Sequence, residues 1–452
     1  MDVRVAVVGG GITGLAAALR LRDRLPRARI TVFDQATRLG GKLATGPLGE
    51  SGAENFLARD PSGGESAAVA LTRRVGLGDE LVHPRPVPAA VVVDGQLRPL
   101  PPKTLLGVPS ELSTVESVAR PVAALDRDEG RPLLSPGDDP AVGALVRARL
   151  GDDVVDRLVD PLLGGVYAGR ADLLSLLATM PGLAAAALTE PTLVGAARAA
   201  IAASAAHRGT GPVFATVQSG LSTLVDAVVR ALGPVDFRLG QPVRALDRTA
   251  DGWRLTTGPA ARPEYSTVDG VVLAVPAGRA HRLWPAVPPV EYASVALVTL
   301  ALPEPRLPEL SGFLVPAVEH RAVKAVTFFG HKWAHQGRPD GVALVRASLG
   351  RYGETEILHR TDDELAATVH AELSGLVGPM PAPVATTVTR WGGALPQYAP
   401  GHVERVARTR AALPPTLALA GAGYDGVGIP ACIRSGEVAA DRIALALGES
   451  ST

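Results

Sequence analysis

The chain has 452 residues, 46% hydrophobic and 20% charged, which is enough for two or three globular domains with a large core. Acidic and basic residues number 45 each, so the zero net charge gives no overall field that would hold nucleic acid. The only cysteine, Cys432, excludes an intramolecular disulfide and a cysteine-rich metal site, and this usage fits a reducing cytoplasm.

The first forty residues have the pattern of a parallel β–α–β unit. Residues 3–8 predict a buried strand, 13–25 a helix with apolar residues at helical spacing, and 28–34 a second buried strand. The chain enters the first strand at once, without a charged segment and a cleavable apolar stretch, so we expect no signal peptide.

The middle of the chain mixes helical and strand patterns. Helices are predicted over residues 66–76, 142–160, 183–206, 220–232 and most of 354–378. Strand patterns occupy a hairpin within 84–109, strands over 236–258, a buried strand over 268–277 and an antiparallel sheet over 292–350. The longest apolar run, 173–189, contains a proline and is too short to span a bilayer, while peripheral membrane contact stays open.

The last part of the chain again has the order strand, glycine cluster, helix. "LALAGAGYDG" (417–426) predicts a final buried strand, and a helix follows from about Ile429. Two such units lie at opposite ends of the chain with mixed material between them. This predicts an α/β fold with α+β insertions, in which separated segments assemble one nucleotide-binding domain.

The first glycine cluster has the spacing of a dinucleotide-binding turn. In "VVGGGITGL", Gly9 permits a tight turn, Gly11 lets the backbone approach a pyrophosphate, and Gly14 permits close helix–strand packing. Asp34 ends the second strand, where an acid can accept hydrogen bonds from ribose hydroxyls. Because Asp34 would repel a 2′-phosphate, NADP is disfavoured.

"RLGGKL" (38–43) follows directly and brings two more glycines, with Arg38 and Lys42, toward the phosphates. With these residues the chain resembles the flavoproteins with two dinucleotide-binding-type domains, among them monoamine oxidases, phytoene desaturases and protoporphyrinogen oxidases. The resemblance implies FAD rather than NAD. Cys432 does not lie in a flavin-attachment motif, so we expect non-covalent FAD.

Four further segments resemble one branch, the HemY-type porphyrinogen oxidases: residues 50–63, 160–176, 390–406 and 421–436. The expected fold is a Rossmann-like FAD-binding domain with an inserted mixed-sheet substrate domain and a helical subdomain. The expected boundaries are 1–60, 205–275 and 405–452 for the FAD-binding domain, 61–104 and 276–404 for the substrate-binding domain, and 105–204 for the mainly helical subdomain.

The resemblance also implies the residues that bind FAD. They are Gly9, Gly10, Gly11, Ile12, Thr13, Gly14, Asp34, Gln35, Arg38, Gly41, Lys42, Gly52, Ala53, Glu54, Asn55, Val243, Trp391, Val427, Gly428 and Ile429. Some positions depart from the family pattern. The family usually has Glu-Ala at positions 34–35 and Gly-Pro-Glu/Asp-Ser at positions 52–55, so Asp34, Gln35, Ala53 and Asn55 differ from it. The family commonly has Asp at position 170, where this chain has arginine.

The family converts a porphyrinogen to a porphyrin in three two-electron rounds, and FAD passes the electrons to oxygen with release of hydrogen peroxide. The resemblance implies coproporphyrinogen III as substrate, since soluble Gram-positive members typically take it. Protoporphyrinogen IX, typical of membrane-associated members, is the alternative. Remoter alternatives are a phytoene desaturase, an amine oxidase, or a flavin-free binding protein like the GDP-dissociation inhibitors. Transient contact with a downstream chelatase stays open.

The cofactor supplies the difficult chemistry, and the protein positions the substrate and excludes water, so no catalytic residue is assigned. The pocket should be apolar with cations at its rim. Arg59 is the candidate for a propionate contact and Tyr167 for the pocket wall; a solvated loop arginine and a packing tyrosine are the alternatives. We interpret His402 as a structural rather than a catalytic histidine. No acidic partner stands near His331 and His335, so we expect no metal site.

Overall fold

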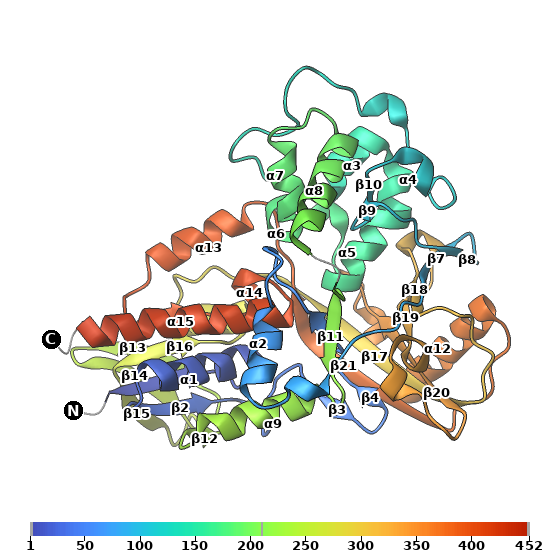
Figure 1. The fold of residues 1–452 in the computed structure, drawn as a ribbon. Coiled ribbons are helices and arrows are strands. Elements are labelled where there is room, and N and C mark those ends of the chain that lie inside the picture. Colours follow the sequence, from blue (N-terminus) through green and yellow to red (C-terminus); the bar gives the residue numbers. More distant parts are fainter. Residues whose placement is uncertain (1–2, 209–210, 450–452) are drawn as a thin grey trace.

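The computed structural model describes residues 3–208 and 211–449, and its mixed α/β architecture confirms the predicted fold class. A five-stranded sheet, parallel throughout, forms the first body (Figure 1). Its strand order is β12 (Asp236–Arg238), β2 (Arg29–Phe33), β1 (Arg4–Val8), β16 (Gly270–Leu273) and β22 (Leu417–Leu419). Its strands come from both ends and the middle of the chain, so distant segments build one sheet.

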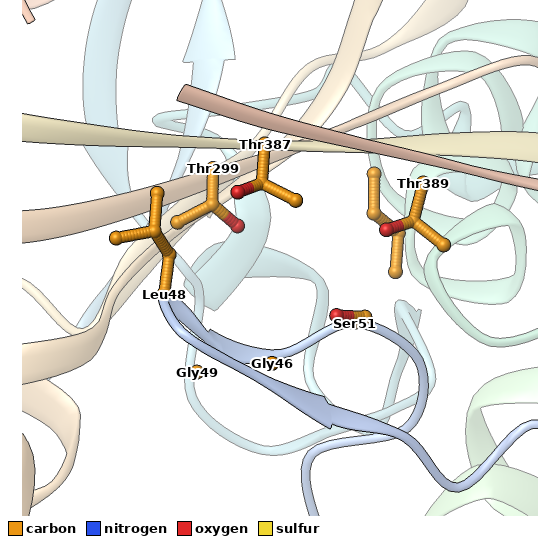
Figure 2. A pocket seen from close by; sticks show the side chains of 8 residues that line it. Gly46, Leu48, Gly49, Ser51, Thr299, Thr387 and Thr389 are labelled. Carbon is orange, nitrogen blue, oxygen red and sulfur yellow. The ribbon is translucent and has the colours of Figure 1, made fainter. Parts of the chain in front are cut away.

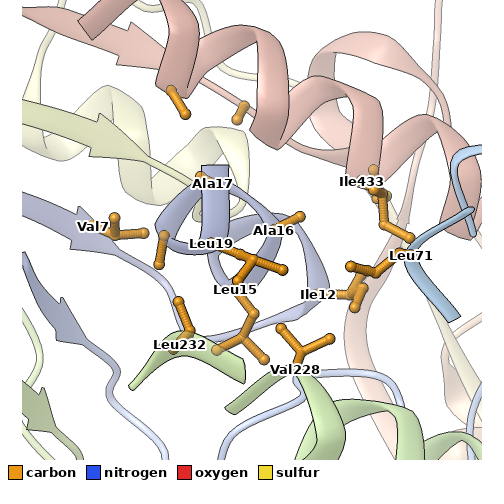
Figure 3. Close-up of a cluster of buried hydrophobic side chains, with 14 of the residues drawn as sticks. Val7, Ile12, Leu15, Ala16, Ala17, Leu19, Leu71, Val228, Leu232 and Ile433 are labelled. Atoms are coloured by element: carbon orange, nitrogen blue, oxygen red, sulfur yellow. The ribbon is translucent and has the colours of Figure 1, made fainter. Parts of the chain in front are cut away.

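Helices cover one face of this sheet. They are α1 (Ile12–Arg24), α9 (Leu221–Leu232) and α15 (Ile429–Glu449), with α2 (Ala67–Arg74) alongside. Figure 3 shows the resulting core, in which Leu15 and Leu19 of α1 meet Val228 of α9. The apolar spacing of each helix provides the stripe that this packing buries. The opposite face carries the antiparallel meander β13 (Ala245–Thr249), β14 (Gly252–Thr257) and β15 (Glu264–Val268).

A seven-stranded sheet forms the second body, and it confirms the antiparallel pattern predicted over residues 292–350. Only the β18–β7 pair is parallel among its described pairings. In order, its strands are β21 (Ala385–Pro396), β17 (Tyr292–Pro303), β20 (Val342–Leu349), β19 (Val323–Phe328), β18 (Gly312–Leu314), β7 (Ala89–Val93) and β8 (Gln96–Pro99). Helix α12 (Asp362–Val377) packs on one face.

The third body is helical and lies above the junction of the two sheets in Figure 1. Its helices are α3 (Val142–Leu150), α5 (Asp160–Tyr167), α6 (Leu176–Thr179), α7 (Pro181–Ala187) and α8 (Leu193–Arg208). Residues 142–160 are helical as predicted, but the segment is broken at Gly151, which takes φ +88 and ends α3. The helix predicted over 183–206 is likewise broken between α7 and α8, where Pro191 lies.

Besides several short 3₁₀- and π-helical turns, short strands and α-helices complete the described part of the chain. They are β3 (Thr45–Gly46), β4 (Gly49–Glu50), β5 (Phe56–Leu57), β6 (Leu81–Val82), β9 (Thr104–Leu105), β10 (Val108–Pro109), β11 (Phe214–Val217), α4 (Asp152–Val154), α10 (Ala277–Leu283), α11 (Phe329–Lys332), α13 (His402–Ala411) and α14 (Ala422–Asp425). The strand predicted over 417–426 therefore ends early, and a helical turn, α14, follows it. None of the described helices is both long and apolar enough to cross a membrane.

Candidate functional site

The turn between β1 and α1 is shaped by two glycines that the fold itself requires. Gly9 has φ +114, and a Cβ there would lie 2.3 Å from the Ala274 carbonyl oxygen. A Cβ on Gly14 would lie 1.8 Å from the carbonyl oxygen of Gly9. Any side chain at either position would therefore push α1 away from the sheet.

Gly11 differs, because the protein leaves room for a side chain there. Its φ is −73, and the nearest atom to an added Cβ is the Gly41 Cα at 3.9 Å. No side chain of a described residue caps the first turn of α1, and that turn has no acidic residue. A bound pyrophosphate would account for both features, since it needs close backbone approach and free N–H groups at a helix start.

Asp34 fixes the edge of this turn. Its Oδ2 accepts a hydrogen bond from the Gly10 N–H at 2.6 Å, and its Oδ1 accepts one from the Ala36 N–H at 2.7 Å. The carboxylate thus stabilises its own loop, and only its remaining lone pairs are left for a ribose.

The other two residues predicted on the ribose and adenine side lie near this loop. Gln35 is exposed, and its amide oxygen accepts a hydrogen bond from Arg279 at 3.2 Å. Val243 lies buried in the segment after β12.

Residues 38–42 lie directly beside the turn, because the Gly40 N–H donates to the Gly10 carbonyl at 2.9 Å. The Arg38 guanidinium donates to the carbonyls of Leu39, Gly41 and Leu43, so it holds the shape of this loop. Its charge remains near the turn, where a phosphate would lie.

Lys42 reaches across to the seven-stranded sheet and donates to the Ala394 carbonyl. Desolvation by the surrounding protein lowers the pKa of Lys42, yet the residue keeps an exposed surface. Lys42 thus links the loop that follows the turn to β21, the strand that carries Trp391.

The segment 52–55 is held by a buried ion cluster around Glu54. The carboxylate pairs with Lys332 and Arg346, and Arg346 also donates to the carbonyls of Glu50 at 3.0 Å and Gly52 at 3.2 Å. Burial alone would raise the pKa of Glu54, but the two cations outweigh it and lower the pKa to about 2. Asn55 donates to the same carboxylate at 3.2 Å.

Neither Lys332 nor Arg346 is among the predicted site residues. The stretch "TFFGHKWAH" resembles the family's segment around a Lys-Trp pair, and this resemblance could have indicated Lys332. Arg346 occurs in an ordinary strand pattern, and nothing near it in the sequence marks its role. The chain separation from Glu54 is 278 residues for Lys332 and 292 for Arg346, so only the fold brings them together.

Trp391 connects this segment to β21. Its indole N–H donates to the Ser51 carbonyl at 2.6 Å, and the Arg38 guanidinium lies 6.0 Å from the centre of its ring. Ala53 also lies in this segment and packs against the core of the first body. Figure 2 shows the loop Gly46–Ser51 lying against the sheet. The pocket between the loop and the strands has a volume of about 10 Å³. That volume holds about one water, so the loop packs closely on the strands.

The C-terminal glycine cluster joins the first body to the helical one. Helix α15 begins at Ile429, as the sequence predicts, and the Gly428 carbonyl accepts from the Cys432 N–H at 2.9 Å. Val427 packs against the core of the helical body. The hydroxyl of Ser435 accepts from the Gly421 N–H at 2.7 Å, which ties the glycine loop to the helix.

Tyr167 ends helix α5 and is buried, with its ring 5.7 Å from that of Tyr398. Desolvation raises the pKa of Tyr167 to about 12, so its hydroxyl stays protonated. Beyond Tyr398, the ring of His402 follows at 4.5 Å; burial lowers the pKa of His402 to about 4 and keeps it neutral. These three rings form one row between the helical body and α13.

Arg59 lies apart from these groups, in the loop after β5. Its guanidinium donates to the Gly63 carbonyl of the same loop at 3.0 Å, and the residue is partly buried. No hydrogen bond or ion pair among the described residues joins Arg59 to Tyr167 or Trp391.

Within the described ranges, no group of three or more His, Cys, Asp or Glu side chains could hold a metal ion.

Comparison with known proteins extends these observations over almost the whole chain. A coproporphyrinogen III oxidase from Mycobacterium leprae is 40% identical over 94% of this chain and 95% of its own length. The coproporphyrinogen III oxidase of Bacillus subtilis is 30% identical over 96% of each chain. A solved structure from Exiguobacterium sp. 255-15, provisionally assigned as a protoporphyrinogen oxidase, superposes with a TM-score of 0.85 at 31% identity, covering 98% of this chain and 99% of that one.

A profile of the family described as "Flavin containing amine oxidoreductase" matches residues 12–444, from the first turn of α1 to the interior of α15. The match begins directly after Gly11 and includes Gly14, the Glu54 cluster, Trp391 and the C-terminal glycine loop. The residues at the turn also fit a dinucleotide, since Gly11 and the uncapped helix start are otherwise unexplained. The chain therefore belongs to the family of flavin containing amine oxidoreductases and is an FAD-dependent oxidoreductase.

Proposed function

We propose that this protein oxidises coproporphyrinogen III to coproporphyrin III in haem biosynthesis. Six electrons and six protons leave the substrate, and three molecules of oxygen take them up to give three of hydrogen peroxide. The observation that carries the proposal is the end-to-end match to bacterial proteins named coproporphyrinogen III oxidase, at up to 40% identity.

Protoporphyrinogen IX oxidase is the second candidate, and the likeness to the Exiguobacterium structure favours it. The two substrates share the macrocycle and differ in two side arms, which are propionates in one and vinyl groups in the other. The number of cations that meet the substrate arms therefore decides between them.

We further propose that the predicted cofactor residues hold FAD between the two sheets, where Lys42 joins them. The phosphate turn and the N-terminus of α1 would take the pyrophosphate, Asp34 the ribose, and the segment around Val243 the adenine. Gly52–Asn55, Trp391 and Val427–Ile429 would surround the flavin ring. Bound FAD supplies the hydride acceptor and its reoxidation by oxygen.

The chain's own residues would fix geometry and exclude water. Glu54, held by Lys332 and Arg346, makes the segment 52–55 rigid. The seven-stranded sheet and helix α5 enclose the substrate side, so residues 61–104 and 276–404 would form the substrate domain and 105–204 its helical cover. Tyr167 would line the apolar wall, and Arg59 would contact a propionate.

The proposal includes the setting of the reaction. Oxygen is the electron acceptor, and the cytoplasm is the compartment. The product would pass to a chelatase by transient contact, and the protein would make a peripheral membrane contact.

The test is a comparison of kcat/KM for anaerobically prepared coproporphyrinogen III and protoporphyrinogen IX. The purified protein should show the visible absorbance of a flavin and release three peroxides per porphyrin formed. A higher kcat/KM with protoporphyrinogen would favour the second candidate. A colourless protein that cannot be reconstituted with FAD would overturn the oxidase assignment and favour a binding protein on the same fold.

A further inference from the structure

The short helix α14 is held from two sides through one carboxylate, that of Asp425. The Arg410 guanidinium of α13 donates to its Oδ1 at 2.7 Å and also to its Oδ2, a forked contact that fixes the orientation of both groups. The Ser435 hydroxyl of α15 donates to the same Oδ2. Asp425 therefore joins α13, α14 and α15, which meet beside the start of α15 in Figure 1.

The Ser435 hydroxyl connects both ends of α14 to α15. It accepts a hydrogen bond at 2.7 Å from the N–H of Gly421, the residue directly before α14. A serine hydroxyl has a single hydrogen, and this one goes to Asp425 at the other end of α14. Because Ser435 is only 4% exposed, water would not readily replace either contact if the hydroxyl were removed.

These contacts lie where α15 crosses the start of α1. A Cβ on Gly436, the residue after Ser435, would lie 2.2 Å from the Thr13 carbonyl oxygen and 3.1 Å from the Ala17 nitrogen. A Cβ on Gly421 would lie 3.6 Å from the Thr13 hydroxyl oxygen. Ser435 therefore attaches the glycine loop (residues 421–428) to α15 at the place where α15 packs on the first turn of α1.

The segment that follows α14, Val427–Ile429, is the one proposed to lie beside the flavin ring. The Gly428 carbonyl accepts from the Cys432 N–H at 2.9 Å, and the Gly426 carbonyl accepts from the Cys432 thiol at 3.6 Å. Both bonds attach the segment to the first turn of α15. Its position relative to the five-stranded sheet therefore depends on how α14 and α15 are held together.

The ion pair in this link adds little to the stability of the fold. The side chains of Arg410 and Asp425 are 32% and 26% exposed, and an ion pair that water reaches is weak. The Ser435 hydroxyl matters more, because without it the buried Gly421 N–H would lose its acceptor. The Asp425 carboxylate fixes the direction of that hydroxyl, so the two residues together define one position of the loop.

We propose that Ser435 and Asp425 are a positioning pair, anchored by Arg410, that holds Val427–Ile429 in place relative to the turn between β1 and α1. The inference rests on the proposed function and deepens it, because the turn would take the pyrophosphate of FAD and the segment would lie beside its ring. A dinucleotide that is bound at both places needs them correctly spaced. Loosening the pair would therefore weaken FAD binding and change the surroundings of the flavin ring.

The test replaces Ser435 with alanine, Asp425 with alanine, and both together. FAD affinity is measured by titration of the apoprotein, and visible circular dichroism of the loaded protein reports the surroundings of the flavin ring. We expect Ser435→Ala to weaken FAD binding about tenfold and to change the circular dichroism, and Asp425→Ala to do the same to a smaller extent. The double variant should lose less than the product of the two single losses, because the residues share one hydrogen bond.

Ser175 provides the matched control, because it is a fully buried serine in the helical body with the same kinds of contact. Its hydroxyl donates to the Asp139 carboxylate at 2.7 Å and accepts from the Ala178 N–H at 3.0 Å. Ser175→Ala should lower the melting temperature about as much as Ser435→Ala does. It should leave FAD affinity and the circular dichroism of the flavin unchanged, so the comparison separates a loss of position from a loss of stability.

Three results would overturn the proposal: an unchanged FAD affinity in Ser435→Ala, single losses that multiply in the double variant, or an equal loss of FAD affinity in Ser175→Ala. The last result would indicate that the loss reports stability alone. Failure of the proposed function is recognised separately. A parent protein that binds no FAD is detected before any variant is made, and one that binds FAD but oxidises neither porphyrinogen leaves this test intact, because the titration uses no substrate.

Discussion

Replacing Glu54 with glutamine should destabilise the protein strongly, because the two cations around it would remain buried without an anion. Lys332 and Arg346 both pair with the Glu54 carboxylate, and Glu54 and Arg346 are almost fully removed from solvent. Glutamine keeps the shape and can still accept hydrogen bonds. The loss would therefore report charge compensation rather than packing.

The magnitude follows from the pKa of Glu54, which falls from 4.5 to about 2 in the folded protein. This difference converts to about 3 kcal/mol, which matches the roughly 3–5 kcal/mol expected when one partner of a buried ion pair is removed. A lowered folded-state pKa gives stability that is present above the unfolded value of 4.5 and is lost as the pH falls toward 2.

Urea unfolding of the flavin-loaded protein, followed by tryptophan and flavin fluorescence, measures this effect at pH 7 and pH 3. At pH 7, Glu54→Gln should unfold at a clearly lower urea concentration than the parent, and the gap should narrow at pH 3. Glu116→Gln, at an exposed position, is the control and should match the parent. Coincident curves at pH 7, or a gap that does not change with pH, would refute the reasoning.

Three more substitutions test the site. Gly11→Val should melt close to the temperature of the parent apoprotein, because the protein leaves room for a side chain there. The variant should retain no FAD, because the side chain would occupy the path of the pyrophosphate, and full flavin content would contradict this. Arg59→Ala should raise KM more for coproporphyrinogen than for protoporphyrinogen, and an equal rise would indicate that Arg59 only holds its own loop through Gly63. Trp391→Phe removes the hydrogen bond to the Ser51 carbonyl, so it should weaken FAD affinity several-fold, measured by flavin release in dilute urea.

The sequence predicts the glycine turn between β1 and α1 well because its determinants are local. The strand, the spaced glycines, the helix and Asp34 all occur within 34 residues, and each follows from a short-range rule. The start of α15 near Ile429 is predicted for the same reason. Helix boundaries were predicted less well, since the breaks at Gly151 and near Pro191 lie within long helix-favouring patterns.

The ion cluster around Glu54 could not be found in this way. Glu54 meets Arg346 across 292 residues, and a strand pattern gives no information about the partner of one of its side chains. The sequence also gives no sign of the β-bulge between Val323 and Ala325, because the position of the bulge depends on the pairing of β19 with β20.

One physical criterion separates the groups that maintain this fold from those that serve a ligand. Gly14 and Glu54 are explained by the protein's own contacts, a helix–turn approach and two ion pairs, so changing them should lower stability first. The protein's own contacts leave Gly11 unexplained, since the space beside it is unused. A change at Gly11 should leave the melting temperature of the apoprotein unchanged and remove affinity for FAD. Variants of the two kinds should therefore differ in which measurement changes.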